Sequence, residues 1–169
     1  YAQLMRLHRP IGIYLLLWPT LWALWLAGDG QPPRGVTLVF VLGVILMRSA
    51  GCVMNDITDR DFDPHVARTR DRPLAAGRVQ LGEAMGVMIV LCLLAFGLVL
   101  TQNALTVQLS FVGLALAISY PFMKRIHALP QINLGTAFGW AIPMAYAAVT
   151  NTAPPIAWLL FLGNVLWSV

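Results

Sequence analysis

Charged side chains are scarce in this 169-residue chain. Lysine and arginine total 11 residues, aspartate and glutamate total 7, and 59% of the chain is hydrophobic. Because soluble domains carry about 25% charged residues and this chain has 11%, its composition excludes an ordinary water-soluble domain. The net charge of +4 does not indicate a nucleic-acid partner, since the basic residues form no stripe interleaved with aromatic side chains.

Cysteine is also rare. Cys52 and Cys92 each lie inside an apolar run, and no CxxC pair or neighbouring histidine gives them a metal-ligand spacing. The sequence therefore excludes a disulfide scaffold and a zinc site, and we expect both thiols to be small buried apolar groups.

Long apolar runs are what the sequence has instead. About 20 helical residues cross the hydrocarbon core of a bilayer, and five runs qualify as full spans: Ile11–Ala27, Val36–Met54, Ala84–Leu100, Leu105–Met123 and Ile132–Val149. A sixth run begins near Ile156 and reaches Val169, about 21 Å of helix, so we expect the natural protein to continue. The sequence predicts a single all-α transmembrane domain over residues 1–169, incomplete at its C-terminal end.

Basic residues alternate between the two ends of these predicted spans. Nine of them fall on one side: Arg6, Arg9, Arg60, Arg68, Arg70, Arg72, Arg78, Lys124 and Arg125. The other side has only Arg34. Because loops rich in lysine and arginine stay in the cytoplasm, we expect the N-terminus and the loop after the second span of this multi-pass protein to be cytoplasmic.

Two residue types inside the spans predict details of helix shape and packing. Pro19 and Pro143 should kink their helices or open a backbone carbonyl. Gly135 and Gly139 are separated by three residues, a spacing that allows two helices to approach closely.

Acidic residues gather at the end of the second span. Asp56, Asp59 and Asp63 are spaced i, i+3 and i+7, so on a continuous helix they fall within about 60° of one another. Carboxylate oxygens are the ligands that Mg²⁺ prefers, and Mg²⁺ commonly bridges carboxylates to substrate phosphates. We therefore expect these three residues to bind magnesium, whereas Asp61 points elsewhere and should be solvated. The alternative is a charged helix end whose acids are incidental.

A basic group follows the acidic one. Arginine forks suit phosphate oxygens and lysine acts as a point charge, so an acidic cluster facing a basic one suits a magnesium diphosphate. For Arg68, Arg70 and Arg78 membrane topology is the better explanation. For three others spacing alone leaves phosphate binding and topology equally open: Arg72, Lys124 and Arg125.

Arg48 is the most unusual residue, because it lies about two helical turns inside the second span. Ionisable groups at such positions are costly and usually functional. It precedes Asn55 by seven residues, which places both on nearly one helix face. Arg48 would bind an anionic substrate group, or else it is a snorkelling or ion-paired structural residue.

The run from Arg48 to Asp63, RSAGCVMNDITDRDFD, resembles the NDxxDxxxD motif of the UbiA superfamily of intramembrane prenyltransferases. The later stretches DRPLAAG, YPFMKR and LPQ, with Phe138-Gly139-Trp140, are also similar. The resemblance covers nearly the whole chain, and its details are most similar to the 4-hydroxybenzoate polyprenyltransferase branch of ubiquinone biosynthesis.

This resemblance implies a bundle of about nine helices, dependence on Mg²⁺, and two acidic motifs. The second motif follows the sixth helix in the family and is not within residues 1–169, so we expect this piece alone to be inactive. The expected substrates are a polyprenyl diphosphate and 4-hydroxybenzoate. Asp56, Asp59 and Asp63 would hold Mg²⁺. The diphosphate would be stabilised by Arg72, Lys124 and Arg125, while Arg48 would bind the aromatic carboxylate and Asn55 would orient the ring.

Three alternatives remain at this point. A related enzyme could use another aromatic acceptor. A magnesium transporter or channel would need acidic or polar residues through its spans, which these spans lack, and it has no use for Arg48. A phosphatidyltransferase would continue its aspartate pattern as DGxxAR, whereas Asp59 is followed by Arg60-Asp61-Phe62-Asp63.

Overall fold

The computed structural model describes residues 1–123 and 130–169, and the ordered elements in these ranges are all helical. The chain order is α1 (Ile11–Ala27), α2 (Arg34–Asp59), a short 3-10 helix η1 (Asp63–His65), α3 (Leu81–Val99), α4 (Ala104–Met123), α5 (Pro130–Gly139), α6 (Ala141–Thr150) and α7 (Pro155–Ser168). The all-helical prediction is therefore confirmed.

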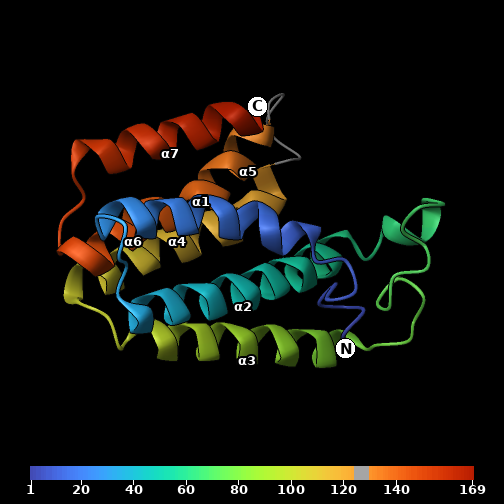
Figure 1. Cartoon of the computed structure of the whole chain (residues 1–169). Helices are drawn as coiled ribbons and strands as arrows, with labels where there is room; N and C mark the ends of the chain where they lie inside the picture. The colour runs from blue at the N-terminus through green and yellow to red at the C-terminus, as the bar shows by residue number, and fades with distance from the viewer. Residues whose placement is uncertain (124–129) are drawn as a thin grey trace.

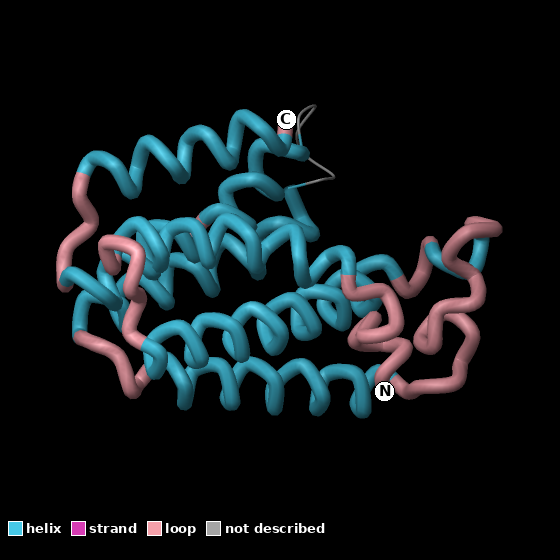
Figure 2. Tube along the Cα trace, viewed as in Figure 1, coloured by secondary structure: helices cyan, strands magenta, loops and turns pink. Residues whose placement is uncertain are grey.

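The helices lie side by side in a bundle (Figure 1). α3 packs along α2, α1 packs against α2 and α6, and α5 packs against α7. Short loops join the helices at one end. The N-terminus and the long segment between α2 and α3 extend from the other end, where Figure 2 shows most of the loop structure. This arrangement places the acidic motif at the end of the bundle with the longest loops.

The predicted fifth span consists of two helices. α5 ends at Gly139 and α6 begins at Ala141. Pro143 has no N–H to donate to the carbonyl of Gly139, and its ring crowds that carbonyl, so the break falls where the proline rule puts it. Trp140 occupies the break, and its indole N–H donates to the carbonyl of Leu109 on α4 at 2.8 Å. Pro19, in contrast, lies within the uninterrupted α1.

The two glycines of α5 lie against α7, as their spacing predicted. A Cβ added at Gly135 would lie 2.8 Å from the Cβ of Ser168 and 3.1 Å from the Cα of Val165. A Cβ at Gly139 would lie 2.8 Å from the side-chain nitrogen of Asn164. The backbones of α5 and α7 therefore approach closely because neither position carries a side chain.

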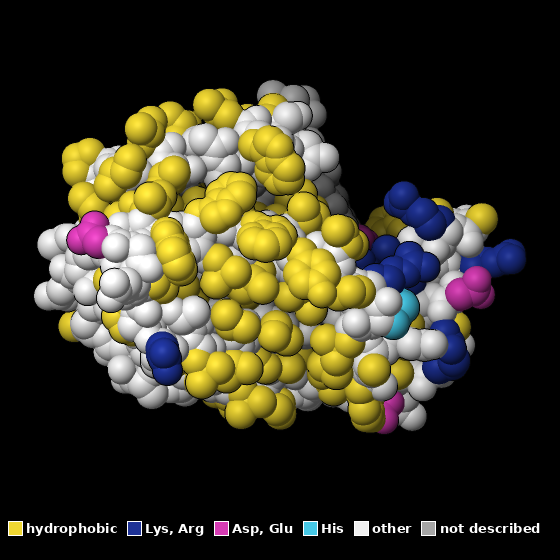
Figure 3. Space-filling view, in the orientation of Figure 1, with side chains coloured by type: hydrophobic (Ala, Val, Ile, Leu, Met, Phe, Trp, Pro, Cys, Tyr) yellow, Lys and Arg dark blue, Asp and Glu magenta, His cyan; other side chains and the backbone are white. Residues whose placement is uncertain are grey.

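The surface is that of a membrane protein. A broad apolar belt covers the middle of the face in Figure 3, and charged side chains lie at its two ends. Among the described residues, four segments are long and apolar enough to cross a bilayer: Arg34–Asp59, Leu81–Val99, Ala104–Pro121 and Gln131–Thr150. The apolar helices α1, with 17 residues, and α7, with 14, are shorter. The chain is an integral membrane protein.

Candidate functional site at the end of α2

The acidic motif does not lie on one continuous helix, so the predicted common face is wrong for Asp63. α2 ends at Asp59, and Asp63 opens the 3-10 helix η1. Pro64 explains the end of the helix. Pro64 has no N–H to donate to the carbonyl of Arg60, and its ring disfavours a helical backbone at Asp63. The Asp63 carboxylate is therefore positioned by a turn instead of by the helix.

The turn nevertheless brings Asp63 next to Asp56. Nη1 of Arg72 lies 2.7 Å from Oδ2 of Asp63 and 3.3 Å from Oδ1 of Asp56, so one guanidinium nitrogen contacts both carboxylates. Thr69 supports this turn by donating its hydroxyl to the backbone carbonyl of Asp63 at 3.0 Å. Both carboxylates are buried, with Asp56 only 1% exposed. Isolated buried charges are costly, and Arg72 compensates both.

A second arginine reaches Asp56 from the segment before α1. Nη2 of Arg6 lies 2.6 Å from Oδ1 of Asp56, the same oxygen that faces Arg72. Charge-assisted hydrogen bonds of this length are among the stronger polar contacts in proteins. Asp56 is therefore held by two guanidinium groups, one from the segment before α1 and one from the segment after α2.

The remaining acids of the motif differ from this pair. Asp61 is exposed and lies 3.2 Å from Nε of Arg60, in agreement with its predicted solvation. Asp59 is the last residue of α2. Within residues 1–123 and 130–169 no three His, Cys, Asp or Glu side chains form a group that could hold a metal ion. Asp56 and Asp63 face arginine side chains, so magnesium binding by all three aspartates stays a prediction.

Deeper in α2, Arg48 lies between helices. Its Nη1 donates to the sulfur of Cys52, and its Nε is buried without a hydrogen-bond partner among the described residues. Gly12 of α1 makes room for the guanidinium, because a Cβ there would lie 2.8 Å from Cζ of Arg48. Oδ1 of Asn55 is likewise buried and unpartnered in this part of the chain. Both groups therefore have hydrogen-bonding capacity that no described residue uses, and their binding of substrate stays a prediction.

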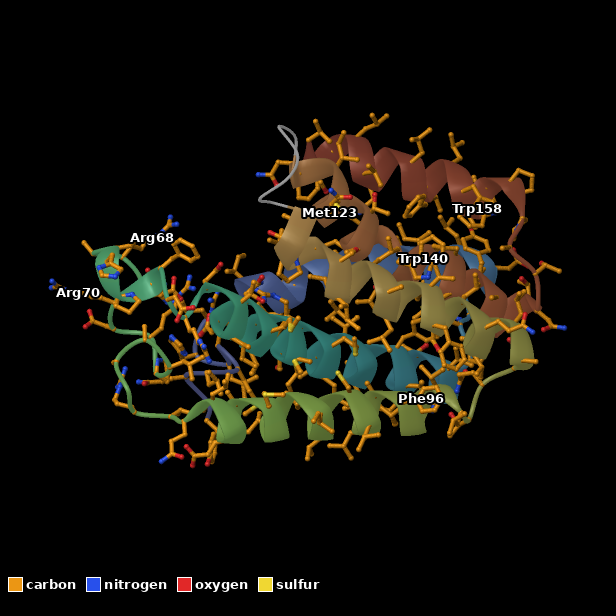
Figure 4. All side chains as sticks on the ribbon, turned by 180° about the vertical axis from the view of Figure 1, so that it is seen from behind. Arg68, Arg70, Phe96, Met123, Trp140 and Trp158 are labelled. Atoms are coloured by element: carbon orange, nitrogen blue, oxygen red, sulfur yellow. The ribbon has the colours of Figure 1, made fainter. Side chains whose placement is uncertain are left out.

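The predicted basic residues separate into three groups. Arg72 lies in the acidic site, and Lys124 and Arg125 lie outside the described residues. Figure 4 shows Arg68 and Arg70 at the far tip of the segment between α2 and α3, whereas Met123 at the end of α4 lies on the bundle. The roles of Arg68, Arg70 and Arg78 in membrane topology stay a prediction.

Sequence reasoning missed two residues of this region. Arg6 was assigned only to membrane topology, and Gly12 was not singled out. A glycine at the second position of a membrane helix was the available signal for Gly12. No sequence pattern connects Arg6 to Asp56 across 50 positions, since that contact depends on how the N-terminal segment folds back.

Comparison with known proteins agrees with this architecture. The profile of the UbiA prenyltransferase family matches residues 16–169. The chain belongs to this family. The expectation drawn from the NDxxDxxxD motif and the later stretches is thereby confirmed.

Relatives and solved structures extend the comparison. A 4-hydroxybenzoate octaprenyltransferase from Nitrosococcus oceani is 65% identical over 168 residues, which cover 99% of this chain and 59% of that protein. The apo structure of a UbiA homolog from Aeropyrum pernix K1 has a TM-score of 0.79 at 27% identity, over 93% of this chain and 59% of that one. A UbiA homolog from Archaeoglobus fulgidus, bound to GPP and Mg²⁺, has a TM-score of 0.79 at 17% identity and shows the same fold over 99% of this chain and 60% of that one. The chain thus spans about three-fifths of the length of these proteins.

Proposed function

We propose that this chain is part of an enzyme that transfers a polyprenyl group from a polyprenyl diphosphate to the ring of 4-hydroxybenzoate, the prenylation step of ubiquinone biosynthesis. The observation that carries the proposal is the pairing of Asp56 and Asp63 around Arg72 at the end of α2, with Arg48 and Asn55 deeper on the same helix. The 65% identity to a protein named for this activity supports the choice of substrates.

The acidic pair suits magnesium. Asp56 and Asp63 both carry carboxylate oxygens, which are hard ligands. The two carboxylates lie close together, because the same guanidinium nitrogen of Arg72 contacts both. Mg²⁺ takes such oxygens together with substrate phosphates. Asp56, Asp63 and Asp59 would hold the ion, which when bound neutralises the diphosphate and makes it a better leaving group. A homolog from Archaeoglobus fulgidus was solved with GPP and Mg²⁺ bound, which supports a magnesium diphosphate as the ligand.

Other residues of the chain would stabilise the diphosphate and shelter the prenyl tail. Arg72 lies beside both carboxylates and would donate hydrogen bonds to diphosphate oxygens as negative charge develops on them. Lys124 and Arg125 would add positive charge there. The apolar helices would shelter the prenyl tail and exclude water, which would otherwise capture the allylic cation formed when the C–O bond breaks.

Arg48 and Asn55 would select the aromatic acceptor. The buried Nε of Arg48 is an unused donor, and a planar guanidinium pairs well with a carboxylate. Asn55 lies about two helical turns further along the same face of α2, so its side chain would contact the ring between the carboxylate and the diphosphate. The ring carbon next to the phenol hydroxyl would then attack the cation, and the ring would lose its proton.

We infer also that the enzyme resides in a bacterial inner membrane with the acidic site facing the cytoplasm. The described arginines other than Arg34 and Arg48 gather at the end of the bundle that holds the N-terminus and the segment between α2 and α3. This asymmetry supports a cytoplasmic location for that end.

The test is prenyl transfer by the full-length protein in liposomes, with 4-hydroxybenzoate and with analogues that lack the carboxylate. We expect turnover with 4-hydroxybenzoate, and we expect Arg48→Gln to raise the KM for this acid more than it lowers kcat. Transfer only to acceptors without a carboxylate would retain the family chemistry and refute the assigned acceptor. Magnesium flux without any prenyl transfer would refute the enzymatic function.

A further inference from the structure

The loop that joins α1 to α2, residues 28–33, lies at the end of the bundle opposite the acidic site (Figure 1). This loop is tightly folded. Asp29 and Gly30 have φ angles of +48° and +82°, and a Cβ added at Gly28 would lie 2.7 Å from the Cα of Pro32. The loop therefore turns back sharply beside the start of α2.

An open cavity of about 860 Å³ lies beside this loop. Its polar lining residues include Trp25 from α1, Gln31 from the loop and Arg34 from the start of α2, and its apolar lining includes Leu38 and Val41 of α2. Binding sites for small molecules commonly have volumes of about 300–1,000 Å³ and combine an apolar wall with a few polar groups. The cavity therefore has the size and the lining of a site for an amphipathic ligand.

Three side-chain donors at this cavity have no partner among the described residues. The guanidinium of Arg34, the indole N–H of Trp25 and the side-chain amide of Gln31 form no hydrogen bond or ion pair within residues 1–123 and 130–169. Asp29, the acidic residue of the loop, is not among the lining residues. The cavity therefore presents one uncompensated positive charge and two neutral donors, which suit the oxygens of a phosphate group.

The residues around the cavity are typical of a membrane boundary. Trp25 is 60% exposed and Leu38 is 59% exposed. Leu38 follows Arg34 by four residues, which places it on the same face of α2 and one turn further into the membrane. Tryptophan is enriched at the headgroup level of a bilayer. A phospholipid bound here would have its phosphate at the level of Arg34 and its acyl chains at the level of Leu38.

We propose that this cavity binds an anionic phospholipid from the leaflet opposite the acidic site. The guanidinium of Arg34 pairs with the phosphate oxygens, Trp25 and Gln31 donate further hydrogen bonds to the headgroup, and an acyl chain lies along Leu38 and Val41. A zwitterionic headgroup fits less well, because its ammonium group finds no acidic side chain in the lining. This lipid site is separate from the acidic site, and its occupancy does not depend on prenyl transfer.

The bound lipid contacts α1 through Trp25 and α2 through Arg34 and Leu38, so it joins the ends of these two helices. A ligand that binds only the folded protein stabilises it, and we therefore expect the lipid to raise the midpoint of thermal unfolding. A phosphate ion without acyl chains shares the contact with Arg34 but lacks the apolar contacts. A lipid that only surrounds the apolar belt is insensitive to the charge of Arg34. These differences separate the proposed site from its alternatives.

The experiment uses the delipidated full-length protein in detergent. Binding of phosphatidylglycerol, phosphatidylcholine and sn-glycerol 3-phosphate is measured by native mass spectrometry and by thermal unfolding. The variants are Arg34→Gln and Arg34→Lys. Arg70→Gln is the matched control, because Arg70 is exposed at the tip of the segment between α2 and α3 and its loss changes the net charge equally (Figure 4).

We expect wild type to bind phosphatidylglycerol at least about tenfold more tightly than phosphatidylcholine. Arg34→Gln should bind phosphatidylglycerol about tenfold more weakly than wild type, since a hydrogen bond to a charged group has an effect of this order. Arg34→Lys keeps the charge and should stay within about threefold of wild type, and Arg70→Gln should match wild type. The thermal midpoint of wild type and Arg70→Gln should rise with phosphatidylglycerol and should not respond to equimolar sn-glycerol 3-phosphate.

Three results would overturn the inference. Equal affinities of wild type for the two phospholipids would show only a lipid of the surrounding belt. An Arg34→Gln protein that binds phosphatidylglycerol as tightly as Arg70→Gln does would separate Arg34 from lipid binding. An equal rise of the midpoint with sn-glycerol 3-phosphate would show an anion site without a lipid. None of these results bears on the proposed function, which prenyl transfer tests separately.

Discussion

Asp63 and Asp61 lie two residues apart in the same turn, yet their surroundings differ. Asp63 is buried against Arg72, whereas Asp61 is exposed beside Arg60. The spacing of the motif predicted that Asp61 differs from the others. It could not predict how Asp63 is placed, because Pro64 ends the helix and the turn that follows depends on Thr69 and Arg72. Local sequence thus predicted that Asp61 would be solvated and missed the turn that brings Asp63 next to Asp56.

The first prediction compares these two acids. Asp63→Asn removes the charge that pairs with Arg72 and a proposed magnesium ligand, so prenyl transfer by the full-length protein should fall by about 100-fold or more. Asp61→Asn changes the net charge equally at an exposed position and should retain activity within about twofold. Equal losses in the two variants would show that the burial of Asp63 has no functional meaning.

The second prediction concerns the space around Arg48. Gly12→Ala places a Cβ against the guanidinium, 2.8 Å from its present Cζ position. Because small displacements of a positioning group can cost up to about 100-fold, the KM for 4-hydroxybenzoate should rise by about tenfold or more. The KM for the prenyl diphosphate should change little. Gly43→Ala is the control, since a Cβ there meets nothing within 4 Å. An unchanged KM for the acid in Gly12→Ala would separate Arg48 from acceptor binding.

At the scale of the helices, the sequence was most informative. The predicted Ile11–Ala27 span coincides with α1, and the other spans differ from the observed helices mainly at their ends. Apolar runs identify helices because the bilayer requires every backbone group to be hydrogen-bonded within the segment. Pro143 indicated irregularity in the fifth span, but only the structure shows two helices that meet at Trp140.

The third prediction tests the contact between α5 and α7. Gly135→Ala introduces a Cβ 2.8 Å from Ser168 and 3.1 Å from the Val165 backbone. Overpacking of this kind costs about 1–3 kcal/mol, so the midpoint of thermal unfolding in detergent should fall. Gly163→Ala on the open side of α7, where a Cβ meets nothing within 4 Å, should leave the midpoint unchanged or raise it, because alanine is the better helix former. A Gly135→Ala protein as stable as Gly163→Ala would contradict the close approach.

At the scale of the whole molecule, the charged side chains gather at the two ends of the bundle. Figure 3 shows the apolar belt between them. The fold class and the family could be recognised from sequence because both depend on patterns along the chain. The ion pairs of Arg6 with Asp56 and of Arg72 with both carboxylates could not, because they join segments that only the folded chain brings together.

The fourth prediction tests the orientation. Two single-cysteine substitutions are compared. Arg68→Cys is made at the tip of the segment between α2 and α3, and Thr152→Cys is made in the loop between α6 and α7, at the opposite end of the bundle (Figures 1 and 4). In inverted inner-membrane vesicles a membrane-impermeant maleimide should label Arg68→Cys and spare Thr152→Cys, and right-side-out vesicles should give the opposite pattern. Labelling of both from one side would contradict a bundle that crosses the membrane as proposed.

The central claim is that the paired carboxylates at the end of α2 hold a magnesium diphosphate for prenyl transfer. The most direct measurement is turnover of polyprenyl diphosphate and 4-hydroxybenzoate by the full-length protein in liposomes, across a Mg²⁺ titration, for wild type and Asp56→Asn. We predict that wild-type turnover requires Mg²⁺ and stops with EDTA, and that Asp56→Asn is inactive at every Mg²⁺ concentration. Wild-type turnover that persists in EDTA, or an Asp56→Asn protein with wild-type activity, would contradict the claim.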